Sequence, residues 1–167
     1  MTDFGIRTAQ VSDEAAITLL LEESYGKLLP AAYGAEPTKG LLPVIARAKP
    51  ELLASTTYYV AANEQGHLVG AGGWTREKPG SGEVEVGVGH VRHVATDPEW
   101  TGRGVGRALI DHIVGQAKAK GVQRLECYAS LNAVDFYARL GFMQLRSIDI
   151  AVGSDAVMPS LLMERIL

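Results

Sequence analysis

The sequence has one cysteine and no long apolar run. Cys127 is the single cysteine among 167 residues, so an intrachain disulfide and a Cys-rich zinc site are excluded, and a reducing, cytoplasmic setting is expected. No apolar stretch approaches the ~18–20 residues that span a bilayer. The start, MTDFGIRTAQ, also lacks the pattern of a signal peptide. We therefore expect no membrane partner.

An excess of basic charge is absent as well. The chain has 16 Lys and Arg against 19 Asp and Glu, a net charge of −3. Nucleic-acid binding favours a basic surface, so no nucleic-acid partner is expected. The length and the ordinary apolar and charged content predict one globular domain over residues 1–167. The unusual number is 19 glycines, about 11% against a usual ~7%.

Residue patterns predict alternating strands and helices. Strands are expected at 4–9, 57–62, 67–75, 83–96, 123–129, 142–152 and 158–167, and helices from 12 to about 24, within 27–56 after a loop, at 103–120 and at 133–140. Gly87 and Gly89 predict a bulge or a close backbone approach. The order β-α-α-β-β-β-α-β-α-β-β indicates an α/β (α+β) fold. Its mixed, mostly antiparallel central sheet is flanked by helices.

A glycine-rich loop lies between the strand at 83–96 and the helix at 103–120. Gly102, Gly104 and Gly106 occupy alternate positions. Such a turn directs successive N–H groups at one anion, and the helix N-terminus adds partial positive charge. Arg103 and Arg107 add formal charge. The pattern predicts a phosphate or pyrophosphate cradle, with a tight packing turn as the alternative, and its spacing matches neither the Rossmann nor the Walker A motif.

Two blocks together resemble the GCN5-related N-acetyltransferase (GNAT) superfamily. The first is the strand at 90–96 followed by the loop at 102–109. The second is Asn132-Ala133, then Phe136-Tyr137, and then Gly141-Phe142. The resemblance covers about residues 57–145. One position departs from it, because the family usually has Gln or Arg where this chain has Thr101. We expect a cradle of backbone N–H groups to tolerate that change.

The resemblance implies acetyl-CoA as the cofactor. No metal is expected, because strand alternation places His90 and His93 on opposite faces and no third ligand is apparent. The pyrophosphate is expected on Thr101, Gly102, Arg103, Gly104, Val105, Gly106 and Arg107. The pantetheine arm is expected along Val94, Ala95 and Thr96, where the fourth and fifth strands separate. Asn132 is expected as a polar partner of that arm, with helix N-capping as the alternative.

The same resemblance implies transfer of acetyl to a primary amine by direct attack in a ternary complex. An N–H near Val94 would polarise the thioester carbonyl. Tyr137 is the expected acid, although its spacing also suits a core aromatic. His90 is the expected base, with His93 and Glu85 as competitors, and strand alternation places His90 and His93 on opposite faces. Cys127 is expected to be a core residue rather than an acyl acceptor.

The partner that takes the acetyl group is expected to be a small molecule or a peptide with a free amine. It is expected to contact residues 24–56 and 146–160, where the resemblance is loosest. Similar proteins often form homodimers, so a homodimer is one expected state. The alternative function is a non-catalytic acyl-CoA-binding regulatory module, which would need the loop of Gly102 to Gly106 but not Tyr137.

Overall fold

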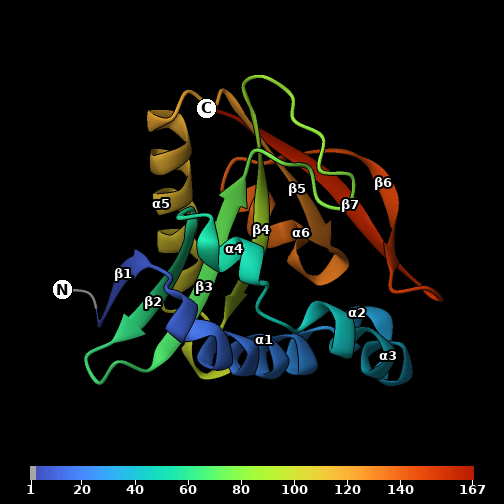
Figure 1. The fold of residues 1–167 in the computed structure, drawn as a ribbon. Helices are drawn as coiled ribbons and strands as arrows, with labels where there is room; N and C mark the ends of the chain where they lie inside the picture. The colour runs from blue at the N-terminus through green and yellow to red at the C-terminus, as the bar shows by residue number, and fades with distance from the viewer. Residues whose placement is uncertain (1–2) are drawn as a thin grey trace.

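A seven-stranded sheet forms the centre of the molecule, in the order β1-β2-β3-β4-β5-β7-β6 (Figure 1). The computed structural model describes residues 3–167. The strands are β1 (Phe4–Thr8), β2 (Tyr58–Asn63), β3 (Leu68–Thr75), β4 (Val88–Thr96), β5 (Arg124–Ser130), β6 (Met143–Val152) and β7 (Ala156–Ile166). Neighbouring strands are antiparallel except β4 and β5, which are parallel. The mixed, mostly antiparallel sheet confirms the expected fold class.

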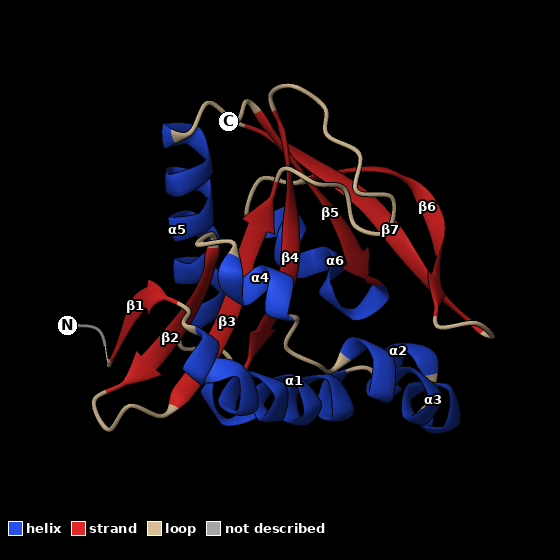
Figure 2. Ribbon diagram, viewed as in Figure 1, coloured by secondary structure: helices blue, strands red, loops and turns tan. Residues whose placement is uncertain are grey.

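Helices cover both faces of the sheet (Figure 2). They are α1 (Glu14–Leu28), α2 (Pro30–Tyr33), α3 (Ala35–Ile45), α4 (Pro50–Ala54), α5 (Val105–Ala119) and α6 (Val134–Arg139), with short 3-10 turns η1 (Val11–Asp13), η2 (Pro98–Trp100) and η3 (Leu131–Ala133). Helices α5 and α6 pack on one face, in a core that includes Trp74, Leu125 and Phe142. Helices α1 and α4 pack on the other face, against Val60 and Ala71.

Helix α5 packs as its apolar spacing predicts. Val105, Leu109, Ile113 and Ala117 are all buried, which places one continuous side of the helix on the sheet. Contact with β3 is close because a Cβ at Gly70 would lie 2.5 Å from the Val105 side chain. The helix N-terminus is therefore held at a fixed place beside the end of β4.

Strands β4 and β5 separate after a short paired segment. Their pairing runs from Val88 opposite Arg124 to His90 opposite Glu126, so β4 beyond His90 leaves the edge that faces β5 without a paired strand. On its other edge, β4 pairs with β3, where Ala71 is opposite Ala95 and Gly73 is opposite Arg92. Two residues of β4 thus stand opposite the single residue Gly72, which defines a β-bulge at residues 93–94.

Helices α1 and α3 support the long β6–β7 hairpin. Leu29 and Leu41 form a buried cluster with Val152 and Met158 of the hairpin. The Tyr33 hydroxyl joins the same parts, since it donates to the Pro159 carbonyl at 2.6 Å and accepts from the Leu131 amide at 2.9 Å. These contacts bring the segment after α1 beside the open end of the sheet.

Three details differ from the sequence expectations. Residues 27–56 hold three short helices, α2 to α4, after an α1 that extends to Leu28, rather than a loop and one helix. The strand expected from residue 83 begins at Val88, and Gly87, with φ +79°, precedes it. The bulge lies at residues 93–94, whereas Gly89 serves close approach, because a Cβ there would lie 3.0 Å from the Leu125 side chain. Among residues 3–167, no helix has the length and apolar character needed to cross a bilayer.

Candidate active site

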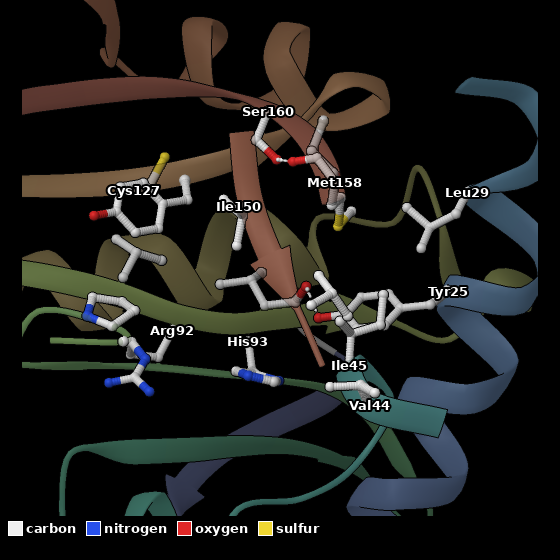
Figure 3. A pocket seen from close by; sticks show the side chains of 18 of the residues that line it. Tyr25, Leu29, Val44, Ile45, Arg92, His93, Cys127, Ile150, Met158 and Ser160 are labelled. Carbon is white, nitrogen blue, oxygen red and sulfur yellow. Dashed lines mark hydrogen bonds between the residues drawn. The ribbon is translucent and has the colours of Figure 1, made fainter. Parts of the chain in front are cut away.

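A cavity of about 350 Å³ opens where β4 and β5 separate (Figure 3). Arg92 and His93 of β4 lie along its lower wall in this view, whereas Ile150 and Met158 of the β6–β7 hairpin lie above them. Tyr25 of α1 and the end of α3 close another side. The remaining lining residues used below are Leu29, Val44, Ile45, Lys49, Val94, Cys127, Tyr137 and Val152. The volume lies within the range of small-molecule pockets.

The bulge in β4 changes which side chains face this cavity. His93 has φ +45°, a conformation that few non-glycine residues adopt and that often marks functional sites. The Tyr58 hydroxyl donates to the His93 carbonyl at 2.7 Å. Val91 belongs to the core under α5, but Ala95 belongs to the core under α1, although the two are an even number of residues apart. Strict alternation therefore fails between them.

His93 consequently lies on the same side as Arg92, so the expected placement of His90 and His93 on opposite faces is wrong. Its ring lies among Leu52, Leu53 and Tyr58. Burial, together with the nearby charges of Lys49 and Arg92, lowers the pKa of His93 to about 3. The ring is therefore neutral near pH 7. Its Nδ1 is buried without a hydrogen-bond partner in the part of the chain that the structure describes.

The other two base candidates lie outside the cavity lining. The His90 ring is buried, and its Nδ1 lies 3.8 Å from Oε1 of Glu126. Burial lowers the pKa of His90, against an opposing effect from Glu126. Glu85 is exposed, and its Oε2 lies 3.4 Å from the Arg124 guanidinium. Of the three candidates, His93 alone lines the cavity, but its low pKa makes it a weak proton acceptor.

Tyr137 is a buried aromatic that also lines the cavity. It is 8% exposed and contacts Phe136 and Phe142 edge-on, with ring centroids 5.1 and 5.3 Å away. Burial raises its pKa well above the usual value, so the hydroxyl is protonated near pH 7. Cys127 lines the same cavity, and burial raises the pKa of its thiol to about 12. The thiol is therefore a poor nucleophile at neutral pH.

The glycine-rich loop presents free backbone amides at the N-terminus of α5. Gly102 and Gly104 have φ +76° and +84°, and Gly104 occupies the N-cap position with no side chain to cap the helix. The first helical bond after the cap is from the Ala108 amide to the Gly104 carbonyl, at 3.0 Å. The amides of the first turn before Ala108 remain available to an anion.

Hydrogen bonds from nearby side chains stabilise the segment before the loop. The buried Asp97 carboxylate accepts from the Glu99 amide at 2.9 Å and lies 3.1 Å from Nε2 of His67. The Thr101 hydroxyl donates to the Pro98 carbonyl at 3.0 Å. At the position where the family usually has Gln or Arg, the side chain is thus used inside the loop.

The loop arginines differ in their surroundings. The Arg103 guanidinium lies 3.6 Å from the ring centroid of Trp100 and 3.0 Å from the Asp3 carboxylate. Arg107 is exposed on the first turn of α5. A Cβ placed on Gly102 or Gly104 would meet no heavy atom within 4 Å. The open space beside the amides and these cations fits a phosphate-bearing ligand.

The remaining expected cofactor residues connect the loop to the cavity. Val94 lines the cavity, and its carbonyl lies 3.5 Å from the Tyr25 hydroxyl, while Ala95 is buried under α1. Thr96 ends β4, paired with Gly70. Asn132 is exposed inside η3, and the N-cap of α6 is Ala133, so the N-capping alternative for Asn132 is wrong.

Several cavity residues lie in the ranges 24–56 and 146–160, where the acceptor was expected to bind. Tyr25 comes from α1, Ile45 ends α3, Lys49 follows α3, and Met158 belongs to β7. The sequence did not single out these four side chains, because no local motif connects their segments. Arg92 of β4 was also not singled out. In the described range 3–167, no group of three or more His, Cys, Asp or Glu residues could hold a metal ion.

Known proteins share this sequence pattern and fold. The family model for the acetyltransferase (GNAT) domain matches residues 31–158. The amino-acid acetyltransferase of Mycobacterium tuberculosis is 27% identical over 155 residues, which cover 87% of this chain and 71% of that protein. Two further curated relatives match over shorter segments. The matched segment covers 26% of an uncharacterized N-acetyltransferase from Methanocaldococcus jannaschii and 37% of the glucosamine 6-phosphate N-acetyltransferase from Trypanosoma brucei brucei.

Solved structures show the same fold at low sequence identity. A GCN5-related N-acetyltransferase from Rhodopseudomonas palustris has a TM-score of 0.81 at 22% identity, with 100% of this chain and 98% of that chain covered. The PaiA N-acetyltransferase from Thermoplasma acidophilum, solved in complex with coenzyme A, has a TM-score of 0.72 at 19% identity, with 98% and 99% covered. The family match extends over most of the chain, and the chain therefore belongs to the GNAT family of N-acetyltransferases.

Proposed function

We propose that residues 1–167 form one acetyltransferase domain that moves acetyl from acetyl-CoA to a primary amine of a small molecule or peptide. One observation carries the proposal. A cavity lined by Val94 and Tyr137 lies between the separated strands β4 and β5. The coenzyme A complex of the PaiA relative supports the choice of cofactor. A cytoplasmic location stays a prediction from the single cysteine.

The glycine-rich loop would hold the cofactor by its phosphates. The amides of Val105, Gly106 and Arg107 begin α5, and positive charge from Arg103 and Arg107 lies beside them. The unpaired edge of β4 at Val94 and Thr96 would hydrogen-bond the extended arm, with Asn132 as a further polar partner. Acetyl-CoA supplies an activated thioester to this site.

The catalytic proposal assigns two groups to the thioester end. A backbone N–H near Val94 would stabilise negative charge on the carbonyl oxygen. As the amine nitrogen bonds to the acetyl carbon, the C–S bond breaks, and Tyr137 would give its proton to the leaving sulfur. A high pKa keeps that hydroxyl protonated. The thiol of Cys127, with a pKa of about 12, supports direct attack by the amine rather than an acetyl-cysteine intermediate.

Removal of the amine proton is assigned to His90. Its ring does not line the cavity, so proton transfer would pass through water. His93 is nearer but neutral and weakly basic. We therefore assign His93 a structural place in the bulge and keep His90 as the proposed base.

The test is turnover of Tyr137→Phe beside the wild type. Consumption of acetyl-CoA is measured with an aliphatic amine, an amino acid, a polyamine and a peptide with a free N-terminus. We expect the variant to have a kcat at least about 10²-fold below that of the wild type. The Kd for CoA should be unchanged. Tyr59→Phe is the matched control, because the Tyr59 hydroxyl contacts Trp74 in the core, outside the cavity. Wild-type turnover in Tyr137→Phe would refute the acid role. CoA binding without turnover in the wild type would favour the regulatory module.

A further inference from the structure

The charged side chains that line the cavity are basic in the part of the chain that the structure describes. Lys49 and Arg92 both line it, and no Asp or Glu does so among residues 3–167. A site selective for a polyamine or another purely cationic acceptor would need carboxylates. Lys49 and Arg92 therefore favour an acceptor that carries a negatively charged group besides its amine.

The Arg92 guanidinium has further N–H groups that can donate to a negatively charged group. The guanidinium is half-buried and donates one hydrogen bond, from Nη1 to the Thr75 hydroxyl at 2.9 Å. Glu51 and Glu77 influence it electrostatically, but both are exposed and neither lies within 4 Å of it. An arginine with five donors and a planar fork suits a carboxylate.

Much of the remaining lining is apolar. Ile150 and Met158 of the β6–β7 hairpin lie above Arg92 and His93, and Val44 and Ile45 of α3 lie beside His93 (Figure 3). Leu29, which follows α1, and Val152 also line the cavity. A cavity of about 350 Å³ lies at the small end of ligand pockets. The combination fits a small acceptor with an acidic group on one side and an apolar group on the other.

On the basis of the proposed function, we propose that the acceptor is an α-amino acid with an apolar side chain. Its carboxylate binds Arg92 and Lys49, and its side chain lies on the wall of Ile45, Ile150 and Met158. Arg92 stands two residues before Val94 on β4, which places the carboxylate site near the expected acetyl carbon.

The test compares three acceptors that share one side chain. Leucine has a carboxylate, leucinamide has a neutral amide in its place, and isoamylamine has neither. We measure kcat/KM for each with wild type, Arg92→Gln and Arg92→Lys. We expect Arg92→Gln to lower kcat/KM for leucine about 10- to 100-fold and for isoamylamine by less than about twofold. We expect Arg92→Lys to recover part of the activity toward leucine. The ratio between variants cancels the different basicity of the amines.

Arg47→Gln is the matched control. Arg47 is exposed, lies two residues before Lys49 and does not line the cavity, so the variant removes the same charge outside it. Equal loss toward leucine in Arg47→Gln and Arg92→Gln would overturn the proposal. Wild-type acetylation of isoamylamine as fast as leucine would also overturn it, while the acetyltransferase function stands. No acetylation of any of the three acceptors by the wild type would overturn this inference alone. The proposed function would then be decided by the wider panel of a polyamine and a peptide described above.

Discussion

Gly104 and Gly121 provide a matched pair for testing the glycine-rich loop. Both have φ +84°, and a Cβ on either would meet no heavy atom within 4 Å. They lie at opposite ends of α5, Gly104 at the N-cap and Gly121 just after the C-cap Lys120. Alanine at either position thus introduces the same backbone strain and no steric clash inside the protein.

The stability cost follows from that strain. A left-handed conformation costs an L-residue roughly 1–2 kcal/mol, and the lower entropy of the unfolded alanine chain offsets about 0.4–1 kcal/mol. We expect each variant to lose about 1 kcal/mol, which lowers the Tm by about 2–4 °C for a chain of this length. Thermal unfolding should therefore give similar values for Gly104→Ala and Gly121→Ala.

Binding of CoA should separate the two variants. In Gly104→Ala, a methyl group and a shifted backbone stand beside the first amides of α5. Loss of one hydrogen bond to a charged phosphate costs about 1.5–3 kcal/mol, or at least about a tenfold rise in Kd. Titration calorimetry with CoA is the assay, and Gly121→Ala should bind as the wild type does. Equal affinity of both variants would refute the cradle and favour a turn that serves packing alone.

Two further variants test the bulge and the helix contact. The pKa of His93, about 3, lies below its usual value. Between about pH 6.5 and 3, His93 is therefore protonated in the unfolded chain but neutral in the folded chain. The free energy of unfolding falls as the pH drops through that window, by up to about 1.36 kcal/mol per pH unit. His93→Asn, which tolerates the positive φ, should flatten this slope in urea unfolding from pH 4 to 7, and an unchanged slope would contradict the assignment. In Gly106→Ala, the new Cβ would lie 2.7 Å from the Phe136 ring, so we expect a loss of about 1–3 kcal/mol with part of it recovered by Phe136→Leu in the same chain. Thermal unfolding measures both, and an unchanged Tm for Gly106→Ala would contradict the contact.

Local patterns predicted the parts of the fold that depend on neighbouring residues. The four-residue spacing from Val105 to Ala117 identifies α5 because each apolar side chain falls on one helical face. The segment at 27–56 was harder because its helices are short and Pro43 lies inside α3. Their packing on the β6–β7 hairpin, through contacts such as Leu41 with Val152, holds them in place.

In the candidate site too, only the local part could be predicted from sequence. The loop around Gly102 and Gly104 is contiguous in sequence, so its spacing alone indicates an anion site. The bulge at His93 depends on Gly72 in another strand, where a Cβ would lie 2.9 Å from the Val94 side chain. Strand alternation cannot reveal such a partner. For the acceptor, the sequence indicated the ranges 24–56 and 146–160. It did not indicate which of their side chains meet, because that depends on how α1, α3 and β7 pack in the folded chain.

The central claim is direct transfer of acetyl from acetyl-CoA to an amine. Its most direct test is the intact mass of the protein after incubation with acetyl-CoA, without acceptor and then with the amine that turns over fastest, while released CoA is quantified. We predict an unmodified protein in both samples, and one N-acetylated amine for each CoA released. An acetylated protein that accumulates without acceptor and passes its acetyl group to the amine, or no acetylated amine at all, would contradict the account.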